Sequence, residues 1–247
     1  MCDSCGCGDT NVVPLDVQQR ILSENERGAA HNRHHFVERS LVAINVMGSP
    51  GAGKTALLEA TARALGGQRR IGALAGDLAT DNDARRLEAA GIRAHAINTG
   101  SACHLDAAMV HRALHHMPWK DLDYLFIENV GNLVCPAVYD LGQAANVVIL
   151  SVTEGEDKPL KYPVMFRKAD LVLITKTDLL PYLPGVSLEA LMENLERVMP
   201  DPRVIPLSAL TGEGMNLWLD WLEERYRARE VLTPAAHRHH QHEPVHA

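Results

Sequence analysis

The sequence lacks the features that mark membrane, secreted and general nucleic-acid-binding proteins. No stretch approaches the ~18 consecutive apolar residues that a membrane-spanning helix requires. The first residues lack the basic-then-apolar pattern of a secretory signal peptide. Lys and Arg number 24 against 31 Asp and Glu, and the net charge of −7 disfavours sequence-independent binding of nucleic acid. We therefore expect a cytoplasmic protein whose partners are neither membranes nor nucleic acids.

Cysteine is scarce, and the five residues are an odd number that fits disulfide pairing poorly. Because cytoplasmic thiols stay reduced, the five favour metal ligands or reactive groups. Cys2, Cys5 and Cys7 form a C-x-x-C-x-C motif. If Met1 is removed, the α-amine of Cys2 adds a fourth donor. Three thiolates and an amine suit Ni²⁺, although Zn²⁺ also fits, and a redox-active cysteine cluster is the alternative.

The order of apolar and polar segments predicts an α/β protein with a doubly wound, mostly parallel sheet. Strands are expected over 41–47, 69–76, 93–97, 123–128, 145–152, 169–175 and 203–207, and helices near 54–65, 81–90, 105–117, 187–199 and 214–229. We expect this domain to span 40–230. A flexible metal-binding strip (1–13) and a helical linker (14–39) precede it, and a His-rich tail (231–247), expected to be disordered, follows.

The segment GSPGAGKT (48–55) matches the phosphate-binding P-loop pattern G-x-x-x-x-G-K-[ST]. It lies directly after an apolar strand and directly before a helix, which is the context that the motif requires. Gly48, Gly51 and Gly53 allow backbone N–H groups to surround phosphates. Lys54 is expected to reach the β- and γ-phosphates, and Thr55 to hold Mg²⁺.

Two later segments predict that the nucleotide base is guanine. TKTD (175–178) resembles the N-K-x-D element of GTPases, in which the Asp carboxylate accepts hydrogen bonds from guanine. Asp178 would then select guanine, while Lys176 packs along the base; Thr175 replaces the usual Asn and loses a bridging amide. SALTGEG (208–214) resembles the loop whose backbone amide, near Ala209 and following Ser208, contacts the guanine O6.

Acidic residues at strand ends are candidates for the catalytic machinery. ENVG (128–131) resembles a D-x-x-G switch, so that Glu128 could hold Mg²⁺ through water and the Gly131 N–H could sense the γ-phosphate. Asp77 ends another strand at the same crevice and could orient Mg²⁺ or the attacking water. Asp81 and Asp83 are interpreted as helix-start residues.

The remaining cysteines predict a second metal site. Cys103 and His104 are adjacent at the start of a predicted helix, and Cys135 follows Gly131 by four residues. Three such ligands are one short of tetrahedral Zn²⁺, and water or a second subunit could supply the fourth. Each cysteine alone would be a buried apolar residue. Another six histidines are interpreted as surface or satisfied side chains: His31, His34, His35, His111, His115 and His116.

These motifs together resemble the HypB family, the nickel-insertion GTPases of nickel–iron hydrogenase maturation. The resemblance rests on MCDSCGCG, HNRHHF, GSPGAGKT, GDLATDNDARR, GSACHLDA, ENVGNLVCP, EGEDKPLKYP, TKTDLLPY and SALTGEG. It implies a P-loop GTPase of the SIMIBI-like class, which forms nucleotide-gated dimers and uses GTP, GDP and Mg²⁺. It also implies a tight nickel site at Cys2, Cys5 and Cys7, and a second site for zinc or nickel at Cys103, His104 and Cys135. The partners it implies are the nickel chaperone HypA and the hydrogenase large subunit.

Three other functions stay open at this point. A urease-accessory GTPase of the UreG type shares the P-loop, but the C-x-x-C-x-C terminus and the adjacent Cys–His pair are not expected of it. A passive metal-storage protein would bind many metal ions without hydrolysing GTP. A P-loop ATPase or small-molecule kinase would prefer ATP, and Asp178 argues against it. The His-rich tail, with His237, His239, His240, His242 and His246, is either a storage element or a solvated end.

Overall fold

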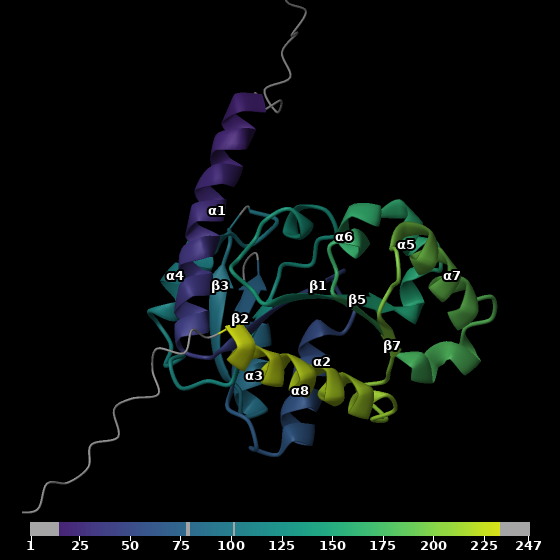
Figure 1. Ribbon diagram of the computed structural model, residues 1–247. Helices are drawn as coiled ribbons and strands as arrows, with labels where there is room; N and C mark the ends of the chain where they lie inside the picture. Colours follow the sequence, from purple (N-terminus) through teal and green to yellow (C-terminus); the bar gives the residue numbers. More distant parts are fainter. Residues whose placement is uncertain (1–14, 78–79, 101, 233–247) are drawn as a thin grey trace, which may run out of the picture.

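The fold is built on one sheet of seven parallel strands. The structure is a computed structural model that describes residues 15–77, 80–100 and 102–232. The strands are β1 (Val42–Gly48), β2 (Ile71–Asp77), β3 (Arg93–Asn98), β4 (Tyr124–Glu128), β5 (Ala145–Ser151), β6 (Leu171–Thr175) and β7 (Val204–Pro206). Their order is β3-β2-β4-β1-β5-β6-β7, with every neighbouring pair parallel. The predicted doubly wound sheet is therefore confirmed (Figure 1).

Helices connect these strands within the described residues. The α-helices are α1 (Leu15–Glu38), α2 (Lys54–Leu65), α3 (Asn82–Ala89), α4 (Ala107–Leu114), α5 (Lys158–Lys161), α6 (Pro163–Arg167), α7 (Leu188–Val198) and α8 (Met215–Leu232). The 3-10 helices are η1 (Cys135–Ala137), η2 (Val152–Glu154) and η3 (Thr177–Tyr182). In this described part of the chain, no helix is both long enough and apolar enough to cross a membrane.

Helices cover both faces of the sheet, and successive strand residues bury alternately against the two layers. On β1, Ile44 and Val46 pack in a core with α2, α3 and α8. Ala43 lies in a second core with α1 and α4, and Met47 lies in a third with α6 and α7. Because both faces are covered, the central strands are continuous apolar runs.

Helix α1 lies beside α4, and its C-terminal half is packed into the domain (Figure 1). Asn32 is fully buried, and its Nδ2 donates to the carbonyl oxygens of Ala107, at 2.9 Å, and Leu141, at 3.1 Å. Phe36 is buried in the core that α4 shares. The proposed division into strip, linker, domain and tail stays a prediction, since the strip and most of the tail lie outside the described residues.

The strand order creates a crevice at the carboxyl edge of the sheet. Strand β1 lies between β4 and β5, so the chain runs outward in opposite directions on its two sides. Ligands of open α/β sheets bind at such a switch point. The residues that end β1, β2, β4 and β6 at this edge are Gly48, Asp77, Glu128 and Thr175, all from segments that the sequence predicted for the nucleotide site.

Candidate nucleotide and metal sites

The P-loop, residues 48–55, has a backbone that requires glycine at two positions. Gly53 has φ 100°, in the left-handed region, where it forms the N-cap of α2. A Cβ at Gly48 would lie 2.5 Å from the carbonyl oxygen of Ile149 on β5. The loop is therefore held tightly against the sheet, with the N-terminus of α2 opening into the crevice, a geometry that suits phosphate groups.

Lys54 is buried and is held by the loop it belongs to. Its Nζ donates to the carbonyl oxygens of Gly48 and Ser49, at 3.1 Å each. Burial lowers the pKa of Lys54, while the nearby carboxyl of Glu128 opposes that change. The ammonium group thus lies within the P-loop, where both of its hydrogen-bond partners are neutral carbonyl groups.

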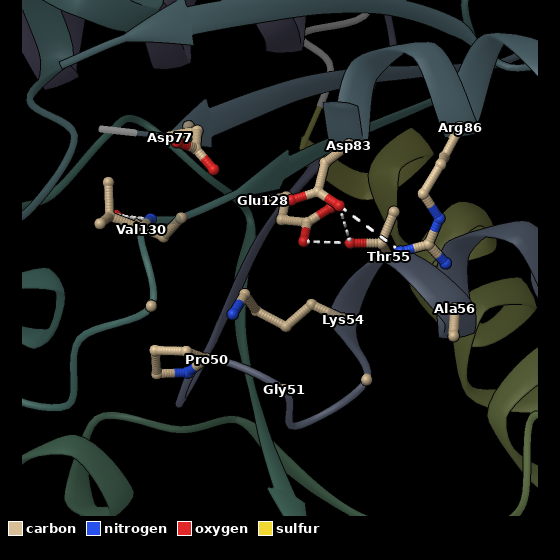
Figure 2. Close-up of a pocket in the computed structure, with 14 residues that line it drawn as sticks. Pro50, Gly51, Lys54, Thr55, Ala56, Asp77, Asp83, Arg86, Glu128 and Val130 are labelled. Carbon is tan, nitrogen blue, oxygen red and sulfur yellow. Dashed lines mark hydrogen bonds and ion pairs between the residues drawn. The ribbon is translucent and has the colours of Figure 1, made fainter. Parts of the chain in front are cut away.

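Thr55, Asp83 and Glu128 converge beside the P-loop (Figure 2). The Thr55 hydroxyl lies 2.8 Å from Glu128 Oε1 and 3.0 Å from Asp83 Oδ1. Glu128 is only 4% exposed, and burial raises its pKa to about 7. Its Oε2 is buried and meets no hydrogen-bond partner among the described residues. A hydroxyl with two carboxylates, one of them incompletely paired, is a set of hard oxygen donors that fits Mg²⁺.

These groups line a pocket of about 500 Å³ at the carboxyl edge of the sheet. Asp77, the last residue of β2, lies across the pocket from Thr55 and Asp83 (Figure 2), and its Oδ1 accepts a hydrogen bond from the Thr80 N–H at 3.1 Å. Arg86 of α3 also lines the pocket and forms a bidentate pair with Glu59, with both N···O distances 3.0 Å. The pocket thus combines the carboxyl groups of Asp77 and Glu128, which end two strands, with the guanidinium group of Arg86 on α3.

The two segments predicted to bind guanine, TKTD and SALTGEG, lie next to each other, and TKTD contacts the P-loop. Ser208 Oγ donates to Asp178 Oδ1 at 2.5 Å, which joins TKTD to SALTGEG. Lys176 adopts a left-handed backbone with φ 61°, and its Nζ donates to the Gly51 carbonyl at 2.7 Å. The Thr175 hydroxyl donates to the Ala52 carbonyl at 2.7 Å. Thr175 therefore supplies its own bridge to the P-loop in place of the missing amide.

Gly131 lies directly against the P-loop. A Cβ at this position would lie 2.7 Å from Pro50 Cγ and 2.9 Å from Pro50 N. Only glycine permits this approach. The segment from Glu128 to Cys135, called the switch segment below, therefore touches the P-loop close to where the γ-phosphate would bind.

Cys103, His104 and Cys135 form one cluster, as the sequence predicted. Their ligand atoms all lie within 4.8 Å of one another, and the two sulfur atoms are 3.1 Å apart. The His104 ring stacks on Tyr139 with centroids 3.8 Å apart, and burial lowers its pKa. The hydrogen bond from Cys103, and then burial, raise the pKa of the Cys135 thiol. Two thiols and a neutral imidazole are donors that suit Zn²⁺ or Ni²⁺.

Asn129 joins the nucleotide pocket to this cluster. It follows Glu128, it is 1% exposed, and its Oδ1 accepts from the backbone N–H of Leu105, the residue after His104, at 3.1 Å. Its Nδ2 donates to Asn45 Oδ1 on β1 at 3.1 Å. Both loops that carry the candidate metal ligands are thus attached to the end of β4.

Sequence reasoning placed the main groups but missed three that line the pocket. Asp83 does lie in the first turn of α3, yet its carboxyl also accepts from Thr55. Arg86 and Asn129 received no role. The segment GDLATDNDARR contained the only signal for Asp83 and Arg86, because their spacing of three places them on one helix face. Cys2, Cys5 and Cys7 and the tail histidines lie outside the described residues.

Comparison with known proteins identifies the family. A family model of the CobW/HypB/UreG nucleotide-binding domain matches residues 42–206. The hydrogenase maturation factor HypB of Azotobacter chroococcum mcd 1 is 53% identical over 215 residues, which cover 87% of this chain and 70% of that protein. The chain belongs to the HypB family. It is accordingly a P-loop GTPase, as the sequence motifs predicted.

Two solved HypB structures share its fold. HypB from Archaeoglobus fulgidus is 41% identical with a TM-score of 0.77, covering 83% of this chain and 100% of that one. HypB from Helicobacter pylori in complex with nickel is 38% identical with a TM-score of 0.78, covering 86% and 98%. The family resemblance and the fold class are thereby confirmed. The roles proposed for individual residues of this chain stay predictions.

Proposed function

We propose that this chain is a GTP-hydrolysing metallochaperone that delivers nickel to the large subunit of nickel–iron hydrogenase, with its GTP state gating metal release. The observation that carries the proposal is the switch segment. One run of residues contacts the P-loop through Gly131 and contributes Cys135 to the metal cluster. A movement of this segment toward the γ-phosphate must therefore displace a metal ligand.

The nucleotide site would work through residues of the P-loop, the strand ends and the two guanine segments. Lys54 would exchange its two loop carbonyls for the β- and γ-phosphates, while Asp178, fixed by Ser208, would accept hydrogen bonds from guanine. Thr55 and Glu128, with Asp83 beside them, would hold Mg²⁺, which neutralises phosphate charge when it is bound. Asp77, across the pocket, would orient either Mg²⁺ or the attacking water. The unpaired Oε2 of Glu128 supports this assignment.

The coupling would run through two contacts at the end of β4. Gly131 packs against Pro50 of the P-loop, so binding or loss of the γ-phosphate would move the switch segment. Asn129 accepts a hydrogen bond from the backbone N–H of Leu105 and so links the same segment to the loop that carries His104. In the GTP state we expect the switch segment to order and two chains to meet near the cluster. Val134 and Val138, which are 55% and 49% exposed on either side of Cys135, support a contact there. A partner chain could then complete the metal shell.

The remaining parts of the proposal come from sequence and family. Cys2, Cys5 and Cys7 would bind nickel tightly and pass it onward in the cytoplasm. HypA would act as the nickel chaperone partner, and nickel or zinc would occupy the cluster of Cys103, His104 and Cys135. The Helicobacter pylori relative, whose structure was solved in complex with nickel, supports the choice of metal.

Metal affinity in two nucleotide states tests the proposal. The full chain with Cys2, Cys5 and Cys7 replaced by serine leaves the second site as the only cysteine site. A coupling free energy of ~1–3 kcal/mol predicts a roughly 5–150-fold difference in Ni²⁺ or Zn²⁺ affinity between GDP and a non-hydrolysable GTP analogue. The further change Cys135→Ser should abolish the difference. Identical affinities in both states, with the cysteine site intact, would refute the gating mechanism.

A further inference from the structure

Four histidines gather on the outer surface where α1 and α4 pack together (Figure 1). His31 and His35 lie on α1, and His111 and His115 lie on α4 and at its C-cap. In each pair the residues are four apart, which places both imidazoles on one face of the helix. This histidine cluster, defined as His31, His35, His111 and His115, belongs neither to the nucleotide pocket nor to the site at Cys103.

The nitrogen spacing within each pair matches metal coordination. The Nε2 atoms of His31 and His35 lie 3.1 Å apart, and those of His111 and His115 lie 3.4 Å apart. Tetrahedral coordination with Zn–N bonds of about 2.0–2.1 Å places neighbouring donor nitrogens about 3.3 Å apart. Each helix therefore already presents one edge of a coordination tetrahedron.

The two pairs also face each other across the helix contact. The ring centroids of His31 and His111 are 4.9 Å apart, and those of His35 and His111 are 6.1 Å apart. Imidazoles bound to one tetrahedral ion have centroids about 5 Å apart, given the same bond length. The four rings do not yet share one centre, but His31 and His115 are exposed side chains, so a change of rotamer could bring their nitrogens inward.

A neighbouring side chain fixes which nitrogen of His111 can bind a metal. His111 Nδ1 lies 3.2 Å from Asn32 Oδ1, an oxygen whose orientation is set because Asn32 Nδ2 donates to two carbonyls. His111 must therefore donate from Nδ1, which leaves the Nε2 lone pair directed at His115. His35 Nε2 faces His31 Nε2, while its Nδ1 lies 3.9 Å from the Glu38 carboxylate, beyond hydrogen-bond distance. An outer hydrogen-bond partner such as Asn32 orients a histidine ligand at a metal site.

The surroundings permit an ion to enter. A hollow of about 600 Å³ opens beside the cluster and is lined by His35, His111 and His115 together with Trp119. The cationic side chains of Arg39 and Lys120 at the rim are matched by the anionic Glu38 and Asp121.

We infer that the histidine cluster is a further metal site, which binds a divalent transition metal of the zinc and nickel class through four imidazoles and links α1 to α4. Imidazole is a ligand that suits both ions. Coordination would join the N-terminal helix to the GTPase domain, so metal loading would hold α1 in its observed position.

The test uses the full chain with Cys2, Cys5, Cys7, Cys103 and Cys135 replaced by serine, dialysed against Zn²⁺ or Ni²⁺ alone. His31→Gln with His115→Gln, two exposed positions, should remove one bound equivalent of metal. The matched control, His34→Gln with His116→Gln, removes two exposed histidines from the same two regions and should leave the stoichiometry unchanged. Since the tail histidines are present in every variant, their contribution cancels.

Amide hydrogen exchange supplies a readout that metal bound at the tail could not produce. Zn²⁺ should slow exchange in the C-terminal half of α1 in the parent chain and in the control, but not in the His31→Gln/His115→Gln variant. GTP turnover of the three chains should be the same. An unchanged stoichiometry in the exposed-pair variant, or an equal loss in the control, would overturn the inference, as would identical α1 exchange with and without Zn²⁺.

Discussion

Glu128 is the residue at which function and folding stability oppose each other. Burial raises its pKa to about 7, above the 4.5 of an ordinary Glu, although the Thr55 hydroxyl and the Lys54 ammonium oppose this change. The folded state therefore binds more protons than the unfolded state between these two values, and stability falls as pH rises from about 4.5 to 7. The carboxylate would recover this loss only when a cation occupies the pocket. The nucleotide-free site is consequently a source of instability at neutral pH.

Replacing Glu128 with Gln should therefore stabilise the free protein while impairing it as an enzyme. Without nucleotide or divalent metal, we expect Glu128→Gln to raise the free energy of unfolding at pH 8 by up to about 3 kcal/mol. At pH 4.5 the gain should vanish, and GTP turnover should fall sharply. Urea unfolding at the two pH values measures this effect. Glu193→Gln, on an exposed position of α7, is the control, and matching curves for both variants would contradict the pKa of Glu128.

Among single residues, those with a motif were predictable and those without one were not. Lys54 and Asp178 could be placed in their loops because their patterns have a known geometric purpose, and their roles stay predictions. Asp83 could not, because a sequence gives the phase of a helix but not which neighbouring element its faces meet. The bond from Thr175 to Ala52 depends likewise on how closely β6 approaches the P-loop. Histidines of α1 and α4 meet only after the helices pack, so their cluster was invisible in the sequence.

At the scale of elements, the strands were the most predictable part. All seven predicted strands are present, because a parallel sheet covered on both faces requires continuous apolar runs. The short helices α5 and α6 were missed, since each has few residues and a Pro in its first turn that reads equally well as a loop. Helix α4 ends at Leu114, short of the predicted 117, where the chain turns toward Pro118.

The contact between the switch segment and the P-loop yields a prediction about two elements at once. Gly131→Ala would place a Cβ 2.7 Å from Pro50 Cγ and 2.9 Å from Pro50 N, so one element must move. Overpacking of this kind costs about 1–3 kcal/mol of stability, and we expect GTP turnover to fall with it. Pro50→Ala in the same chain removes part of the clash and should restore part of both losses. A double-mutant cycle measures the coupling, and strictly additive effects would show that the two residues are independent.

At the scale of the whole molecule, the proposed dimer contact can be separated from nucleotide binding. Val138 is 49% exposed beside the metal cluster, and Leu217 is 50% exposed on α8, against the opposite face of the sheet. Val138→Asp should weaken dimerisation with a non-hydrolysable GTP analogue at least tenfold, about 1.4 kcal/mol, without weakening nucleotide binding. Leu217→Asp should leave both unchanged. Sedimentation velocity over a concentration series measures the affinity, and equal dimerisation of the two variants would move the contact elsewhere.

The position of β1 in the centre of the sheet also has a consequence for how the chain is made. Val42 pairs with Tyr124 on one side, and Ile44 pairs with Ala145 on the other. Until β4 and β5 have left the ribosome, β1, which is buried along its whole length, has neither of its neighbours. At ~5–20 residues per second, about 100 residues of translation leave it unpaired for roughly 5–20 seconds. The nascent chain is therefore exposed to aggregation during translation, and the nucleotide site forms only after most of the domain has been synthesised.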